Sequence, residues 1–276
     1  MKDIIKYMLK ALASFDATDV NGLADSLKGH NPEVYKIVTN LHSTAVLPIS
    51  AVVIAIVLVL ELARNATHME GDHQMGVKII AATMFKSALL VVAAQNSMMF
   101  LDAINEVSTK IIANITRDAN INHHAALPEN LDDLVNDTDL GDQAGLIMML
   151  LFPFLITLAA QIVIKVMVIF RFAELYIMTA FASLPIAFLG HPDTKSMGIS
   201  YLQKYAAVSL QAATLMMSVA VYSNFADFSD KLSSIPNNQT LNSWVVNNYT
   251  DFILPPVLLM ILIISSGKFA KALVGQ

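Results

Sequence analysis

The chain of 276 residues contains no cysteine, and charged residues make up only 14% of it. Without cysteine there can be no disulfide framework, thiolate zinc site or cysteine nucleophile. Soluble domains carry about 25% charged residues, so the low charge content is not typical of a soluble enzyme. The net charge of −5 also argues against a general nucleic-acid-binding surface.

Motifs that carry catalytic chemistry are missing as well. The sequence contains no phosphate-binding glycine loop, no GxGxxG and no GxSxG. An acidic pattern begins at Asp137, but it lacks the Gly and Glu of a calcium-binding EF-hand loop. We therefore expect no catalytic residues, no bound metal and no cofactor, and we predict that the protein is not an enzyme.

Long apolar runs are the main feature that is present, and hydrophobic residues make up 55% of the chain. A run of about 18 or more apolar residues is long enough to cross a bilayer as a helix. The sequence therefore predicts an all-α, polytopic membrane helix bundle with about six spans. We place them at residues 45–62, 77–101, 145–168, 171–189, 201–225 and 252–267.

The division of residues 145–190 into two spans depends on Lys165, Arg171 and Glu174, which are costly in the middle of a bilayer. No Gly or Pro lies between Pro153 and Pro185 to mark a turn between two helices. One long helix, giving five spans in total, is the alternative.

Two domains are expected, an N-terminal segment at 1–43 and a transmembrane helix domain at 44–276. The second domain includes a polar segment at 102–144, helical in its first part and acidic and loop-like in its second. Residues 1–15 combine an apolar stripe with lysines spaced four apart, a pattern typical of a helix lying in the membrane interface. The alternative is a short helix that packs on other loops.

Lys and Arg residues are more numerous on the side of the membrane that would hold both termini of a six-span protein. By the positive-inside rule this distribution favours termini in the cytoplasm. If residues 145–190 form one span, the segments after residue 145 change sides, and their Lys and Arg residues count toward the opposite side of the membrane.

Polar residues within the predicted spans are the candidate functional residues. A charged side chain at mid-span costs about 2.5–3.5 kcal/mol on insertion scales, so such residues face protein or water. We interpret them as lining a hydrophilic path or joining subunits, and Arg171 and Glu174 are close enough in sequence to pair. The alternatives are packing between helices of one chain, or contact with the interface. The candidates are Lys86, Gln95, Asn96, Gln161, Lys165, Arg171, Glu174 and Gln211.

A resemblance to a known family rests on the stretch from Leu150 to Phe225, with support from Leu60-Glu61-Leu62 and Gln95-Asn96-Ser97. In that stretch an apolar span is followed by Arg171 and Glu174, then by Pro185, and then by a short loop and a further helix. This pattern resembles the TrbL-type polytopic inner-membrane subunits of type IV secretion systems, especially those of Gram-positive conjugative elements. Arg171, Glu174 and Pro185 match its most recognisable positions.

The resemblance implies a non-enzymatic channel or scaffold subunit of a conjugation apparatus in the cytoplasmic membrane. Its implied partners are other secretion-channel subunits and secretion ATPases, with transient contact to single-stranded DNA carrying a relaxase, in a homo- or hetero-oligomer. The family often places the N-terminus outside the cytoplasm, against the charge count. A stand-alone small-solute transporter or channel and a membrane anchor that only organises partners are the alternatives.

Overall fold

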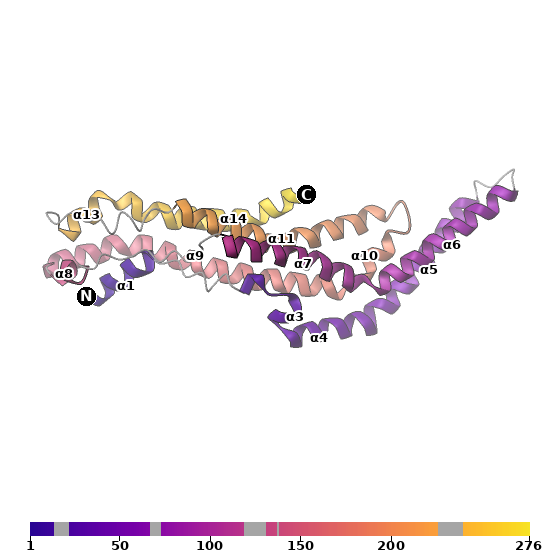
Figure 1. Cartoon of the computed structure of the whole chain (residues 1–276), viewed down its shortest axis with the longest axis horizontal. Coiled ribbons are helices and arrows are strands. Elements are labelled where there is room, and N and C mark those ends of the chain that lie inside the picture. Colours follow the sequence, from indigo (N-terminus) through magenta and orange to yellow (C-terminus); the bar gives the residue numbers. More distant parts are fainter. Residues whose placement is uncertain (14–21, 67–72, 119–130, 137, 226–239) are drawn as a thin grey trace. The chain divides into compact units, whose positions relative to one another are not determined.

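In the computed structural model, helices are the only regular secondary structure among the residues that it describes, which are 1–13, 22–66, 73–118, 131–136, 138–225 and 240–276. This confirms the predicted all-α class. Helices are expected because backbone polar groups in a bilayer must be hydrogen-bonded within their own segment. Figure 1 shows the longer ones. The elements are α1 (Lys2–Ala13), η1 (Gly22–Ala24), α3 (Leu27–His30), α4 (Pro32–Leu41), η2 (His42–Val46), α5 (Leu47–Ala66), α6 (His73–Gln95), α7 (Ser97–Asp118), α8 (Leu131–Asn136), α9 (Leu140–Ala180), α10 (Ser183–Phe188), α11 (Lys195–Phe225), α13 (Leu241–Asn247) and α14 (Tyr249–Leu273).

Five helical segments of the described chain are long and apolar enough to cross a membrane. The first of them joins α4, the π-helical element η2 and α5 into one continuous run. The chain is therefore a multi-pass membrane protein, and the five-span alternative agrees with the structure. The five segments are Pro32–Ala66, Gly76–Gln95, Leu140–Ala180, Lys195–Tyr222 and Tyr249–Leu273.

The division of residues 145–190 into two spans is corrected by the structure, because α9 continues without a break from Leu140 to Ala180. A rise of 1.5 Å per residue gives this helix a length of about 61 Å, roughly twice the apolar thickness of a bilayer. The charged residues of α9 had suggested a boundary. A helix ends where its backbone hydrogen bonding ends, however, and nothing between Pro153 and Ala180 interrupts it.

The predicted span 77–101 is divided between two helices, α6 and α7, with a turn at Asn96. The side-chain amide of Asn96 donates to the carbonyl of Val92 at 2.8 Å. α7 contains the first part of the polar segment 102–144, which was expected to be helical. Its buried positions are Leu101, Asn105, Ser108 and Ile112, whereas Val107 and Ile111 are exposed.

The first of two compact units contains residues 1–24, 111–169 and 212–269. Its core gathers apolar residues of α1, α8, α9, α13 and α14, and the rings of Trp244 and Phe252 meet edge to face at 5.5 Å. Ile5 and Leu9 of α1 are fully buried in this core. These residues of α1 therefore pack against helices of the first unit, whereas Ile4 and Tyr7 of the same helix are exposed.

The second unit contains residues 25–110, 170–211 and 270–276. In it α5 and α6 form a hairpin, and the short helix α10 packs against both (Figure 1). Ile54 of α5, Ala94 of α6, and Ile186 and Ala187 of α10 form a buried cluster. Pro185, a residue of the family-like pattern, is buried in α10.

Candidate functional site

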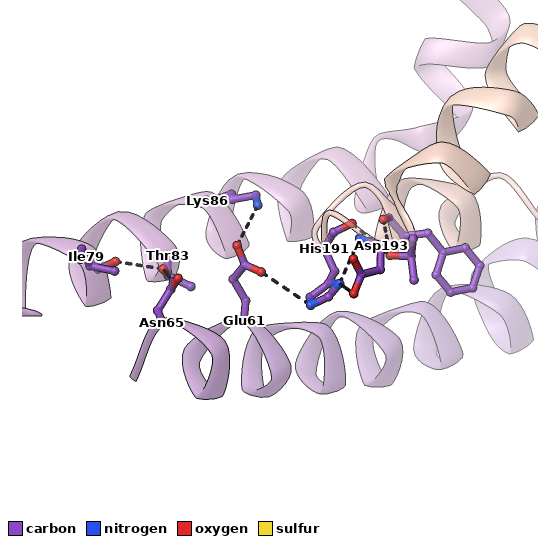
Figure 2. A network of polar contacts seen from close by, with 9 residues as sticks. Glu61, Asn65, Ile79, Thr83, Lys86, His191 and Asp193 are labelled. Atoms are coloured by element: carbon purple, nitrogen blue, oxygen red, sulfur yellow. Dashed lines mark hydrogen bonds and ion pairs between the residues drawn. The ribbon is translucent and has the colours of Figure 1, made fainter. Parts of the chain in front are cut away.

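Glu61 of α5 is the centre of a polar network that joins three elements of the second unit (Figure 2). One carboxylate oxygen lies 3.5 Å from Nζ of Lys86 on α6, and the other lies 3.8 Å from Nε2 of His191, in the turn between α10 and α11. The Glu61 side chain is 15% exposed and that of Lys86 is 47% exposed. The network therefore extends from the interior of the hairpin to its surface.

His191 is held by its own turn. The backbone N–H of Asp193 donates to Nδ1 of His191 at 3.3 Å, and the Asp193 carboxylate lies 3.6 Å from the same nitrogen. A ring nitrogen that accepts a hydrogen bond carries no proton, so in the neutral ring the proton sits on Nε2, facing Glu61.

Sequence spacing explains why this network forms on the hairpin. Glu61 and Asn65 lie four residues apart, so they share one face of α5, and Thr83 and Lys86 share the facing side of α6. The Asn65 amide donates to the Thr83 hydroxyl at 2.8 Å, and that hydroxyl donates to the carbonyl of Ile79 (Figure 2). Two polar rows thus meet along one side of the α5–α6 contact.

Further along the hairpin, α10 is held by a hydrogen bond and a close backbone approach. The buried hydroxyls of Ser50 on α5 and Ser183 on α10 are 2.7 Å apart. Gly190 lies so close to the hairpin that an added Cβ would be 2.6 Å from Cγ1 of Val57 and 2.8 Å from Cδ1 of Leu90. The absence of a side chain at Gly190 therefore lets the end of this segment pack between α5 and α6.

A second polar cluster surrounds Arg171 of α9, which is only 2% exposed. Its Nε and Nη2 donate to the carbonyls of Val208 and Ser209 on α11, both at 3.3 Å, and its guanidinium lies 4.9 Å from the centre of the Phe172 ring. Burying an ion costs several kcal/mol, and each hydrogen bond from a charged donor returns about 1.5–3 kcal/mol. By accepting these hydrogen bonds, the two carbonyls of α11 offset part of the free energy cost of burying the Arg171 cation.

The same part of α11 also binds α7. The Ser108 hydroxyl donates to the Ser209 carbonyl at 2.6 Å, and the Ser209 hydroxyl donates to Oδ1 of Asn105 at 3.2 Å. One turn before Asn105, Asp102 accepts a hydrogen bond from the Tyr35 hydroxyl at 3.1 Å. Burial raises the pKa of the Asp102 carboxyl, and the bond from Tyr35 lowers it in part.

Arg171 and Glu174 were expected to be able to pair, but each takes a partner on α11 instead. Glu174 lies 3.0 Å from Nζ of Lys204. A helix turn places residues three apart on one side, and here that side of α9 faces α11, which offers carbonyls to one residue and an ammonium to the other.

The remaining candidate residues lie outside these clusters. Gln95 and Asn96 are exposed at the turn between α6 and α7, Lys165 is exposed on α9, and Gln161 and Gln211 are half-buried. Sequence reasoning did not select Glu61, His191, Asn105 or Ser108 as candidates. A charged residue near the end of a predicted span, followed by a lysine in the next span, is the signal that could have pointed to Glu61.

Within the described ranges, no group of three or more His, Asp or Glu side chains is placed to hold a metal ion. His191 shows why, because Glu61 and Asp193 approach different nitrogens of its ring. The acidic pattern at Asp137 starts outside the described residues.

The chain matches the family described as TrbL/VirB6 plasmid conjugal transfer like protein over residues 19–183. The chain belongs to this family. The match covers more than half of the sequence, including the α5–α6 hairpin, α7 and α9. Curated proteins and solved structures give no match.

As a member of the TrbL/VirB6-like family, the chain is a membrane component of a conjugal transfer system. The suspected resemblance is thereby confirmed. The matched residues include Glu61, Lys86, Arg171 and Glu174. His191 and the residues of α11 that contact Arg171 and Glu174 follow the matched range. Both polar clusters are thus built by α-helices of the matched region meeting the segment from α10 onwards.

Proposed function

We propose that this protein is a channel or scaffold subunit of a conjugative type IV secretion system in the cytoplasmic membrane, where it helps a DNA–protein substrate to cross. The family match over residues 19–183 is the observation that carries the proposal. In this proposal its partners are other channel subunits and the secretion ATPases, with transient contact to single-stranded DNA and its relaxase.

The two polar clusters suit different parts of that role. Arg171 is buried and donates to two carbonyls of α11, so it holds helices together and does not contact a substrate. Lys86 has an exposed ammonium that Glu61 only partly screens, at a distance of 3.5 Å. We assign to Lys86 a surface facing a polar path or a neighbouring subunit, because a half-exposed ammonium within a span is unfavourable against lipid.

Deletion of the gene in a donor strain tests the proposed function. We expect DNA transfer to be lost while the other channel subunits stay present on immunoblots, and the intact gene to restore transfer. Normal transfer without the protein would refute the proposal. Flux of a small solute through liposomes that contain only the purified chain would favour the transporter alternative.

The role of Lys86 is tested with a pair of variants and a control. Lys86→Leu leaves the Glu61 carboxylate without its lysine partner, so both stability and transfer should fall. In Glu61→Gln/Lys86→Leu no charge is left unpaired, so stability should recover while transfer stays low. Lys78→Leu, at an exposed position near the start of α6, controls for loss of one positive charge. Recovery of transfer in the double variant would show that the pair is only structural.

A further inference from the structure

α7 differs from the other long helices of the described chain. It has 22 residues, yet it is not among the five segments apolar enough to be candidate spans. Charged residues at Asp102, Glu106, Lys110 and Arg117 explain this difference. The position of α7 beside a candidate span therefore decides whether those charged side chains lie within the depth of the membrane or outside it.

Hydrogen bonds fix which part of α7 lies beside which part of α11, and "level" here means position along the length of α11. Asn105 and Ser108 both bond to Ser209, as described above. Ser209 lies within the candidate span Lys195–Tyr222, in a stretch free of Asp, Glu, Lys and Arg that runs from residue 205 to 225. The middle of α7 thus lies level with an uncharged part of a membrane helix.

The opposite face of α7 carries an ion pair at this level. Glu106 and Lys110 lie one turn apart with Nζ and Oε1 2.8 Å from each other, and their side chains are 64% and 73% exposed. Each charge would cost about 2.5–3.5 kcal/mol against lipid at mid-bilayer. This face is therefore unsuited to contact with acyl chains.

Another face of the same unit exposes an apolar side chain at the same level. Arg171 bonds to Val208 and Ser209, which places its neighbour Phe170 level with the α7 ion pair. Phe170 is apolar and 66% exposed. At one depth the unit therefore presents an aromatic side chain on α9 and an ion pair on α7.

We propose that the face of α7 carrying Glu106 and Lys110 borders a water-filled passage within the membrane, and that Phe170 on α9 faces lipid. This inference rests on the proposed function as a channel subunit and names the surface that lines its path. Water is the occupant that fits best. The two charges neutralise each other, so they offer no net charge for an oppositely charged partner, yet both remain exposed and in need of solvation.

The chain contains no cysteine, so single cysteines at positions 106, 110 and 170 can be compared directly in native membranes. Glu106→Cys, Lys110→Cys and Phe170→Cys are treated with a charged, membrane-impermeant thiosulfonate applied to both sides, and separately with a lipid-soluble maleimide. Variants are scored only if the full-length protein still supports DNA transfer, which shows that it has assembled.

We expect the charged reagent to modify positions 106 and 110 at least about tenfold faster than position 170, because the reacting thiolate forms in water and not in lipid. The lipid-soluble maleimide also reacts with the thiolate, so it too should modify position 170 more slowly than positions 106 and 110, although it can reach all three positions. If all three positions react alike with the charged reagent, this level lies outside the bilayer and the inference fails. If position 106 and position 110 both stay unreactive, protein or lipid covers α7, and the inference fails too.

Failure of this inference is distinguishable from failure of the proposed function. Unreactive cysteines at positions 106 and 110, in a strain whose DNA transfer depends on the protein, would refute the lining of the path and leave the conjugal role intact. Transfer that does not depend on the protein would refute the proposed function, whatever the labelling pattern.

Discussion

Replacing Gly190 by alanine tests whether α10 and its turn are packed tightly against the hairpin. The added Cβ would lie 2.6 Å from Cγ1 of Val57 and 2.8 Å from Cδ1 of Leu90, both well inside van der Waals contact. Overpacking of this kind costs about 1–3 kcal/mol. The unfolding equilibrium constant should therefore rise about 5- to 150-fold.

The measurement is the free energy of unfolding in lipid bicelles, obtained by steric trapping. Gly145→Ala is a suitable control, because nothing lies within 4 Å of the added Cβ at that position of α9. Alanine is favoured over glycine inside a helix by about 0.5–1 kcal/mol, so the control should be neutral or stabilised.

A double variant checks the cause of the Gly190→Ala effect. Val57→Ala removes the atom nearest to the new Cβ, so Gly190→Ala should cost less in that background than in the unaltered protein. Leu90 can move aside more easily, because its contact atom is the end of a flexible side chain. Gly190→Ala at the stability of the unaltered protein would refute the described packing of α10, as would strictly additive effects with Val57→Ala.

Three other substitutions follow from the same structure. Gly198→Ala should destabilise the protein more than Gly190→Ala in the same assay, since its Cβ would meet the backbone carbonyl of Pro185 at 2.5 Å, and a smaller effect would contradict this packing. Ser50→Ala should cost about 1–3 kcal/mol by leaving the Ser183 hydroxyl without its partner, and Ser50→Ala/Ser183→Ala should cost less than the sum of the single variants. Leu9→Ala should cost about 2–5 kcal/mol, and Leu41→Ala, at an exposed position, should have little effect; equal losses would refute the burial of α1.

The helical class and most span positions could be predicted from the sequence, because long uncharged runs leave few alternatives to a membrane helix. The continuity of α9 could not. Charge was taken as evidence for an interface, whereas Arg171 is buried and donates to two carbonyls of α11 that lie more than thirty residues away. No local pattern in the sequence reports such a partner.

The candidate site shows the same limit. Lys86 could be selected from its position inside a span, and Glu61 and His191 could not be joined to it without knowing that α6 and the α10–α11 turn both meet α5. The first part of the segment 102–144 was expected to be helical, but the sequence did not show that α7 buries Asn105 and Ser108, which bond to Ser209. Hydrogen bonding decided which side faces the protein.

The residues of the family-like pattern and the exposed charges have separate places in the second unit, and this bears on how a transfer subunit can be dissected. Arg171 and Glu174 join α9 to α11, and Pro185 is buried in the helix that packs against the hairpin. Substitutions there change the assembly of the unit, so a loss of DNA transfer in such variants reports on folding. Lys86 and Lys110 are exposed, and a variant that removes both charges of an ion pair, such as Glu61→Gln/Lys86→Leu, leaves neither charge unpaired. Only variants of this second kind separate the path of the substrate from the structure that supports it.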